Sequence, residues 1–348
     1  MWTENRVFRE DLEGLATCAF IPWDELRGKT VFITGATGLI GYTLTSALLY
    51  YNKEHQAGLR VVALVRDMER AERQFHGQLA DRCELSFVLG TVEELPEIGG
   101  PVDYIVHGAC PTTSRFFVQS PVETIQSIVL GTKNVLELAV KKQVSGMVCL
   151  SSMEVFGKIT HREKLREEEL GYIDLFSPRS SYPESKRLAE TMSCAYAAEY
   201  RVPVTLARLA QTFGPGVASS DERVFAYMAR CAINGEDIRL NTSGAKENTY
   251  LYTADAVSAI LLLLIRGERG TAYNAGNPET YCSVKEMGEI VAQELGNGSI
   301  SVLTNTGKTQ GLYPPEGFLN LNMERLQSLG WRPSKDLREM FWRMSGCF

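Results

Sequence analysis

The sequence predicts an α/β fold in which helices cover both faces of a doubly wound parallel sheet. Six short segments rich in apolar and β-branched residues are each followed by a stretch with helical periodicity. The segments are nearly continuous apolar runs, which is typical of parallel strands buried on both faces. They span residues 30–36, 59–66, 85–91, 102–109, 145–152 and 202–210.

The regular alternation of strands and helices fills residues 28–212 and becomes looser beyond them. We therefore expect a first domain at 28–212 and a smaller α/β domain at 213–348. A strongly apolar stretch at about 250–275 is expected to cross back from the second domain to the first. Residues 1–27 form an amphipathic extension of unknown role.

Composition excludes several classes of protein. With 348 residues, 44% hydrophobic residues and a net charge of −6, the chain suits a globular protein of about two domains that lacks the basic surface nucleic acids need. The longest apolar run, at 259–265, is much shorter than the ~20 residues that span a bilayer, and the start lacks the apolar core of a signal peptide. Eight cysteines without a close pair indicate neither a metal site nor a disulfide framework. The prediction is a cytoplasmic enzyme that binds no nucleic acid, membrane or metal.

The first strand leads into the most informative stretch, KTVFITGATGLIGYTLTSALL at 29–49. Its three glycines are spaced by three between a predicted strand and a predicted helix. Gly35 permits a sharp turn, Gly38 lets the backbone approach a pyrophosphate, and Gly41 lets the helix pack against the strand. This context favours a dinucleotide-binding turn over a purely structural one.

The second strand ends at Arg66, 25 positions after Gly41, where an acidic residue is expected to meet the ribose if the cofactor is NAD. A guanidinium at this place suits the 2′-phosphate of NADP instead. The neighbouring Asp67 could still reach a ribose diol, and Arg66 could be a solvated loop charge. NADP is therefore favoured, and NAD stays open as the alternative.

The fifth strand ends in Ser151 and Ser152, at the sheet edge where parallel α/β sheets bind their ligands. A Ser152 hydroxyl at this edge can hydrogen-bond a reacting oxygen, although paired serines also serve as turn formers. Glu154 follows in the same loop. If the site shields it from water, its carboxyl is a candidate general acid or base; otherwise it is a solvated loop charge.

The helix after this loop contains YPESK, in which Tyr182 and Lys186 are four residues apart and face the same side. A nearby ammonium makes a phenol easier to ionise, so Tyr182 could exchange a proton with a substrate hydroxyl while Lys186 also holds the nicotinamide ribose. Taken alone, such a pair is usually an ordinary feature of a helix surface. Its position after a dinucleotide turn and the Ser152 strand end favours a catalytic role.

Together, TGATGLIG, HGA, LSSMEVFG, YPESK and RLAQTFGPG resemble the extended short-chain dehydrogenase/reductase family, in its NAD(P)-dependent nucleotide-sugar epimerase and dehydratase branch. The resemblance covers about residues 28–342 and implies a Rossmann domain followed by a substrate domain. It also implies catalysis by Ser152, Tyr182 and Lys186, and a homodimer formed through helices at 122–141 and 182–200. The apolar positions of these helices could equally belong to the core of the domain. The expected cofactor contacts are Gly35, Gly38, Leu39, Ile40, Gly41, Arg66, Thr91, Val92, Ala109, Tyr182 and Lys186.

Several positions depart from the family pattern. Met153 stands where related dehydratases often carry an aspartate, whereas Glu154 keeps a glutamate that decarboxylases and some dehydratases share and simple 4-epimerases commonly lack. Asn248 replaces the arginine that pairs with the substrate diphosphate, so Arg179 or Arg223 would have to supply the missing cation. Asparagines usual in the family are replaced by Gln211 and Ile128.

The resemblance and the candidate residues together predict an internal redox reaction on a nucleotide sugar. Tyr182 deprotonates a sugar hydroxyl, hydride passes to the bound cofactor, and the keto-sugar undergoes epimerisation, elimination or decarboxylation. An NADPH-dependent reductase of a small non-nucleotide carbonyl is the alternative, because Arg66 and Asn248 both permit it. A non-enzymatic nucleotide sensor is disfavoured, since it would not need Tyr182 and Lys186.

Overall fold

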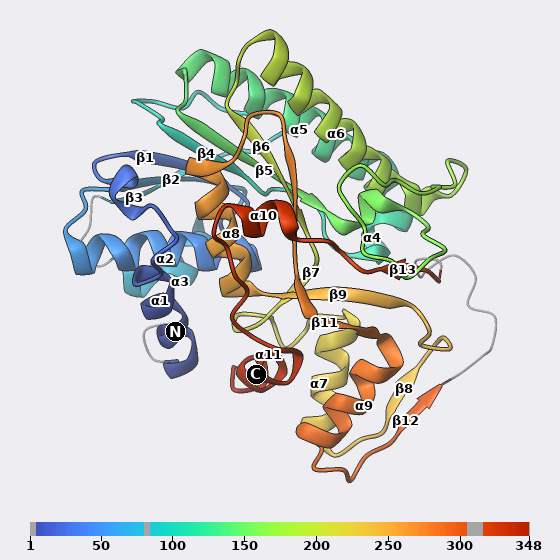
Figure 1. Cartoon of the computed structure of the whole chain (residues 1–348). Helices are drawn as coiled ribbons and strands as arrows, with labels where there is room; N and C mark the ends of the chain where they lie inside the picture. Colours follow the sequence, from blue (N-terminus) through green and yellow to red (C-terminus); the bar gives the residue numbers. More distant parts are fainter. Residues whose placement is uncertain (1–4, 80–83, 305–315, 348) are drawn as a thin grey trace.

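The computed structural model describes residues 5–79, 84–304 and 316–347 of the chain (Figure 1). Within these ranges the largest element is a seven-stranded parallel sheet with the strand order β3-β2-β1-β4-β5-β6-β10. All six strands predicted from the sequence lie in it, which confirms the doubly wound α/β class. Its strands are β1 (Thr30–Thr34), β2 (Arg60–Val65), β3 (Leu85–Leu89), β4 (Tyr104–His107), β5 (Gly146–Ser152), β6 (Val204–Leu209) and β10 (Ala272–Ala275).

Helices cover both faces of this sheet (Figure 1). α5 (Pro121–Lys142) and α6 (Ser181–Glu199) lie side by side over one face, and α2 (Leu39–His55) and α8 (Thr253–Arg266) lie over the other. α3 (Met68–Leu79) packs against β3, and the short α4 (Ser114–Gln119) contacts α5 and α6. Every residue of α8 from Thr253 to Leu264 is buried, which explains why this helix carries the longest apolar run of the sequence.

The N-terminal extension is part of the main body of the molecule. Its helix α1 (Arg6–Ala16) packs against α2 and α8 and buries Phe8, Leu12 and Leu15. A short 3-10 helix, η1 (Trp23–Leu26), follows, and the Trp23 ring stacks on Tyr51 with ring centres 4.2 Å apart. Residues 1–4 of the predicted extension lie outside the described residues.

The C-terminal part is smaller and contains the second and third sheets of the described residues. In the second sheet, β9 (Glu247–Tyr252) is central and pairs with β7 (Gln211–Phe213), β11 (Asn277–Ser283) and β13 (Phe318–Leu319). The third sheet pairs β8 (Ile238–Leu240) with β12 (Val302–Thr304). The predicted boundaries at residues 27 and 212 stay predictions. The helices of this part are α7 (Val224–Asn234), α9 (Val284–Glu294), α10 (Glu324–Ser328) and α11 (Leu337–Ser345).

Membrane-spanning helices and clusters of metal-binding side chains are both absent from the described residues. No helix in those residues is long and apolar enough to cross a bilayer. The same part of the chain contains no group of three or more His, Cys, Asp or Glu side chains arranged to hold a metal ion.

Candidate active site

The turn between β1 and α2 has the geometry that its three glycines predict. Gly35 has a φ angle of 78°, in the left-handed region that favours glycine. A Cβ atom at Gly41 would lie 2.1 Å from the carbonyl oxygen of Gly35, so only glycine allows this close approach. Gly38 is the N-cap of α2 and has no side chain to cap the first N–H groups of the helix. The turn therefore fits an anion such as a pyrophosphate.

The other residues expected to contact the cofactor lie at the same edge of the large sheet. Leu39 and Ile40 are half-buried in the first turn of α2. Thr91 and Val92 follow β3, and the Thr91 hydroxyl accepts a hydrogen bond from the backbone N–H of Glu94. Ala109 follows β4, and its backbone N–H and that of Gly108 both donate to the Oγ1 atom of Thr34 at the end of β1.

Arg66 is exposed at the carboxyl end of β2. It forms no hydrogen bond or ion pair with any other residue that the structure describes. The Oδ1 atom of the neighbouring Asp67 accepts a hydrogen bond from the backbone N–H of Arg70 at the start of α3. Asp67 therefore caps the start of α3. The Arg66 guanidinium has no charged partner among the described residues.

Ser152, Tyr182 and Lys186 come together where β5 ends and α6 begins. The Lys186 ammonium and the Ser152 side chain both act on the Tyr182 phenol and favour its ionised form. The Lys186 ammonium donates to the Leu150 carbonyl at 2.7 Å and lies 5.8 Å from the centre of the Tyr182 ring. The structure thus joins one residue at a strand end with two residues on one face of the following helix. Ser151 instead donates to the buried Glu190 carboxylate.

Lys186 favours ionisation of the Tyr182 phenol, as expected from its place four residues away, but burial opposes ionisation more strongly. Burial raises the pKa of Tyr182 above its ordinary value, and Lys186 lowers it by less. Phe117 contributes to this burial because its ring stacks on Tyr182 with centres 4.2 Å apart. Burial alone would lower the pKa of Lys186, but Cys110 and Tyr182 outweigh it, so that pKa is raised.

Glu154 and Arg179 form an ion pair beside this group. Glu154 lies in the 3-10 helix η2 (Met153–Phe156) directly after β5, and Arg179 lies in η3 (Pro178–Ser180) directly before α6. The Arg179 Nη2 atom donates to the Glu154 Oε1 atom at 2.9 Å, with both side chains mostly buried. The other candidate cation, Arg223, donates instead through Nε and Nη2 to the carboxylate of Asp221.

The structure adds side chains that the sequence reasoning did not single out. His107, at the end of β4, lies between the hydroxyls of Thr34 and Thr132. Burial, and then Lys186, lower its pKa to about 3, so the ring is neutral. Burial lowers the pKa of Lys246 to about 8, and the charge of Glu154 raises it by less. In the sequence, the HGA motif could have drawn attention to His107. For Lys246 the only such sign was its position two residues before Asn248.

The positions that depart from the family pattern are mostly buried. Ile128 packs in one cluster with Phe117, Tyr182 and Ala189, so an apolar side chain supports the Tyr182 ring here. Met153 is buried in the main core. Asn248 is 4% exposed, and Gln211 begins β7.

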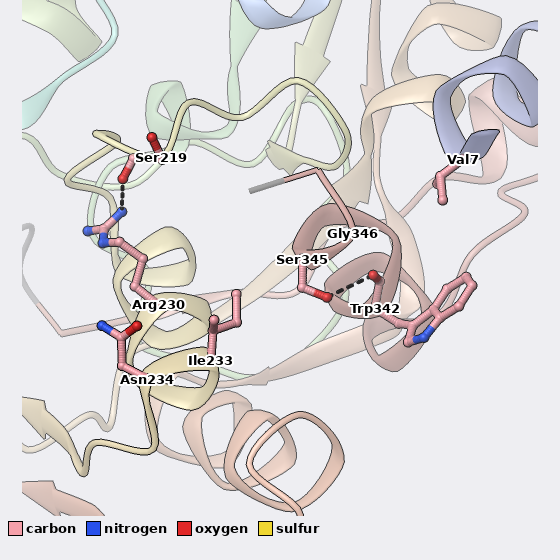
Figure 2. Close-up of a pocket in the computed structure, with 8 residues that line it drawn as sticks. All are labelled: Val7, Ser219, Arg230, Ile233, Asn234, Trp342, Ser345 and Gly346. Carbon is pink, nitrogen blue, oxygen red and sulfur yellow. Dashed lines mark hydrogen bonds between the residues drawn. The ribbon is translucent and has the colours of Figure 1, made fainter. Parts of the chain in front are cut away.

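A cavity of about 460 Å³ lies elsewhere, between α1, α7 and α11 (Figure 2). None of the candidate catalytic or cofactor residues lines it. The cavity therefore lies apart from the candidate active site. Its lining residues are Val7, Ser219, Arg230, Ile233, Asn234, Trp342, Ser345 and Gly346.

A parallel sheet wound with helices, a glycine turn open at a helix N-terminus and a Ser-Tyr-Lys group at the same edge define a dinucleotide-binding enzyme of the short-chain dehydrogenase/reductase type. The model of the NAD dependent epimerase/dehydratase family matches residues 31–276. The chain belongs to this family, which confirms the resemblance seen in its motifs. Its cofactor class is therefore NAD(P).

Curated relatives include two decarboxylases. UDP-glucuronic acid decarboxylase 1 of Xenopus tropicalis is 28% identical over 313 residues, which cover 89% of this chain and 70% of that protein. UDP-glucuronic acid decarboxylase 5 of Arabidopsis thaliana is 33% identical over 242 residues, covering 68% of this chain and 67% of that protein.

Solved structures share the fold. A UDP-glucose 4-epimerase from Thermotoga maritima, solved with UDP-glucose, has a TM-score of 0.75 at 19% identity and covers 92% of this chain and 98% of its own. A dTDP-glucose 4,6-dehydratase from Streptomyces venezuelae, solved with NAD and TYD bound, has a TM-score of 0.76 at 23% identity. It covers 91% of this chain and 95% of its own.

Proposed function

We propose that the protein modifies a nucleotide sugar through a transient keto-sugar, using a bound NAD(P) cofactor. The observation that carries this proposal is the Lys186 ammonium, which lies 5.8 Å from the centre of the Tyr182 ring at the sheet edge where β5 ends in Ser152. The glycine turn lies at the same edge. The decarboxylases among its relatives support a substrate of this class. They also favour decarboxylation or dehydration over simple epimerisation, in agreement with the presence of Glu154.

The cofactor would be held by the residues at this edge. Gly35, Gly38 and Gly41 shape the pyrophosphate turn, and the N-terminus of α2 faces the phosphates. The proposed side-chain and backbone contacts are Leu39, Ile40, Arg66, Thr91, Val92, Ala109, Tyr182 and Lys186. When bound, the nicotinamide ring supplies hydride transfer.

The proton steps belong to side chains of this chain. Because burial keeps the Tyr182 phenol protonated, it must lose that proton before it acts as a base, and the Lys186 ammonium favours this loss. Tyr182 then takes the proton of a sugar hydroxyl that Ser152 orients by hydrogen bonding. Glu154 moves the proton at the carbon next to the new ketone. Its ion pair with Arg179 keeps this carboxylate in one place.

An NADPH-dependent reductase of a small carbonyl compound is the second candidate, favoured by one observation. Asn248, which carries no charge, occupies the position at which an arginine would pair with a diphosphate. Purified protein should be incubated with UDP-, dTDP-, GDP- and CDP-sugars, and the products analysed by mass and NMR. Turnover of one sugar with catalytic amounts of cofactor supports our proposal, whereas stoichiometric consumption of NADPH supports the reductase.

NADP is the cofactor that we favour, with NAD as the alternative. Arg66 is exposed without a partner among the described residues, and Asp67 is engaged at the start of α3. Arg66→Ala should therefore weaken NADP binding by about tenfold or more, as expected for a lost charge-assisted contact, and leave NAD binding nearly unchanged. Arg60→Ala, at the opposite end of β2, serves as the control in titration calorimetry. Equal effects of Arg66→Ala on both cofactors would show that Arg66 is a surface charge.

We also propose that the protein forms a homodimer through α5 and α6. These helices contact each other and carry exposed apolar side chains on their outer surface. Exposed apolar residues gathered on neighbouring helices are typical of a contact surface. They are Val122, Ile125, Leu130 and Val140 on α5 and Leu188 on α6.

A further inference from the structure

Two hydrogen bonds hold the first half of α6 against the end of β5. The Lys186 ammonium donates to the Leu150 carbonyl at 2.7 Å. One turn further along the helix, the Glu190 Oε1 atom accepts a hydrogen bond from the Ser151 hydroxyl at 2.5 Å. Residues four apart share a face of a helix, so both bonds come from the face that also carries Tyr182. The second of the two bonds is made by residues that have no part in the proposed proton transfer.

The Glu190 carboxylate is paired with Arg208, which is the register partner of Ser151 on the neighbouring strand β6. The Nε and Nη2 atoms of Arg208 donate to the two carboxylate oxygens at 2.9 and 2.7 Å. Ser151, Glu190 and Arg208 are all buried. Burial of a carboxylate is costly without a partner, and a bidentate guanidinium both offsets that cost and fixes the orientation of the carboxylate.

Arg208 is itself held from the other side. Its Nη1 atom donates to the Glu167 carbonyl at 2.5 Å. The Oε1 atom of Glu167 accepts from the backbone N–H of Asn274 on the next strand, β10, at 2.9 Å. The contact that Glu190 makes therefore refers α6 to three adjacent strands of the large sheet, β5, β6 and β10. Side chains anchored on such rigid elements keep a site in a more exact geometry than loops do.

We propose that Ser151 and Glu190 are positioning residues of the active site, whose hydrogen bond sets the place of Tyr182 and Lys186 relative to the end of β5. The inference rests on the proposed function, because the reaction proposed there needs that placement. In that reaction the Lys186 ammonium also holds the cofactor, so its bond to the strand cannot be the only one that fixes the helix. A displacement of about 1 Å in an active site can cost ~100-fold in rate.

The test breaks this hydrogen bond from the strand side. Ser151→Ala removes the hydroxyl and leaves the ion pair of Glu190 with Arg208 intact, so the buried charges stay paired. Ser151→Thr keeps a hydroxyl at the same place. Ser193→Ala is the matched control, because Ser193 is also buried on α6 but donates to the Ala189 carbonyl of its own helix. We would measure kcat and KM at saturating cofactor, for whichever UDP-, dTDP-, GDP- or CDP-sugar the unaltered protein turns over, and the midpoint of urea unfolding.

We expect kcat of Ser151→Ala to fall by about tenfold or more with KM nearly unchanged, and Ser151→Thr and Ser193→Ala to stay close to the unaltered protein. A hydroxyl with a purely structural role would lower the urea midpoint and leave kcat of the folded variant unchanged. That result, or a folded Ser151→Thr as slow as Ser151→Ala, would overturn the positioning role while the proposed function stands. If the unaltered protein turns over none of the sugars, the proposed function fails and the positioning role fails with it.

Discussion

The hydroxyl of Tyr182 is the group on which the proposed proton transfer depends. Tyr182→Phe keeps the ring that stacks on Phe117 and removes only the phenol oxygen. Turnover should fall by at least the ~100-fold typical of a general acid-base group, while NAD(P) binding is retained. Tyr200→Phe, just after the far end of α6, is the matched control. Near-normal turnover of a folded Tyr182→Phe variant would rule out the assigned role.

Glu154 has a different role in the proposal, because oxidation of the sugar and the later proton transfer need different groups. Glu154→Gln keeps the shape and a hydrogen-bond acceptor for Arg179 but removes the basic charge. We expect reduced cofactor to form and a keto-sugar to accumulate, because the step after hydride transfer is blocked. The reduced cofactor is measured by its nicotinamide absorbance, and the keto-sugar by mass analysis of the quenched mixture.

The exposed Glu163, which pairs with His161, provides the control variant Glu163→Gln. Formation of the final product by Glu154→Gln at the unaltered rate would make Glu154 a loop carboxylate that only holds Arg179. The reading as a simple epimerase or a reductase would then be preferred.

The sequence predicted the residues of the candidate site that lie on one helix or at one strand end. Tyr182 and Lys186 are four residues apart on one helix, and Ser152 ends a recognisable apolar strand, so their placement needed no distant contact. The pairing of Glu154 with Arg179 joins two segments that are 25 residues apart in the chain. The raised pKa of Tyr182 likewise depends on burial by other elements, which spacing along the chain does not reveal.

At the scale of elements, the N-terminal helix α1 is tied to the opposite end of the chain. The Asp11 Oδ1 atom accepts from the Nη2 atom of Arg343 in α11 at 2.9 Å, and its other oxygen accepts from the Tyr252 hydroxyl in β9. Arg343 in turn donates through Nε to that hydroxyl. Since Asp11 and Arg343 are both buried, the three groups hold α1, β9 and α11 together.

This network predicts a large loss of stability when one charge is removed. Asp11→Ala leaves Arg343 buried with only the more exposed Glu10 as a carboxylate partner, so the free energy of unfolding should fall by about 3 kcal/mol. Glu13→Ala breaks an exposed ion pair with Arg9 on the same helix and should change it little. Urea denaturation, followed by circular dichroism, measures the free energy of unfolding of both variants. Equal midpoints for the two variants would contradict a structural role for Asp11.

The elements of the fold were predictable to different degrees for a physical reason. The first six strands are apolar runs followed by helices, so each is visible in its own sequence. β9 pairs with β7, β11 and β13, which are short segments spread over residues 211–319. Pairing between such distant segments leaves no local pattern in the sequence. The role of residues 5–27 was invisible for the same reason, because their partners lie in α2, α8 and α11.

At the scale of the whole molecule, the outer surface of α5 and α6 decides the assembly. α6 carries Tyr182 and Lys186 on its buried side and Leu188 on its exposed side, so a partner subunit would cover the back of the catalytic helix. Ile125 and Leu188 are exposed apolar residues of the two helices. A glutamate at either position would be desolvated in a dimer interface but stay hydrated in a monomer.

Light scattering coupled to size-exclusion chromatography measures this directly. The unaltered protein should have twice the chain mass of 38.7 kDa, and the double variant Ile125→Glu, Leu188→Glu should elute as a monomer. Ile233→Glu places the same charge at an exposed apolar residue of α7, away from these helices, and should stay dimeric. A monomeric unaltered protein would remove the dimer proposal, and a dimeric double variant would move the interface to another surface. Neither result would alter the role proposed for Tyr182, because the Lys186 ammonium beside its ring belongs to the same chain.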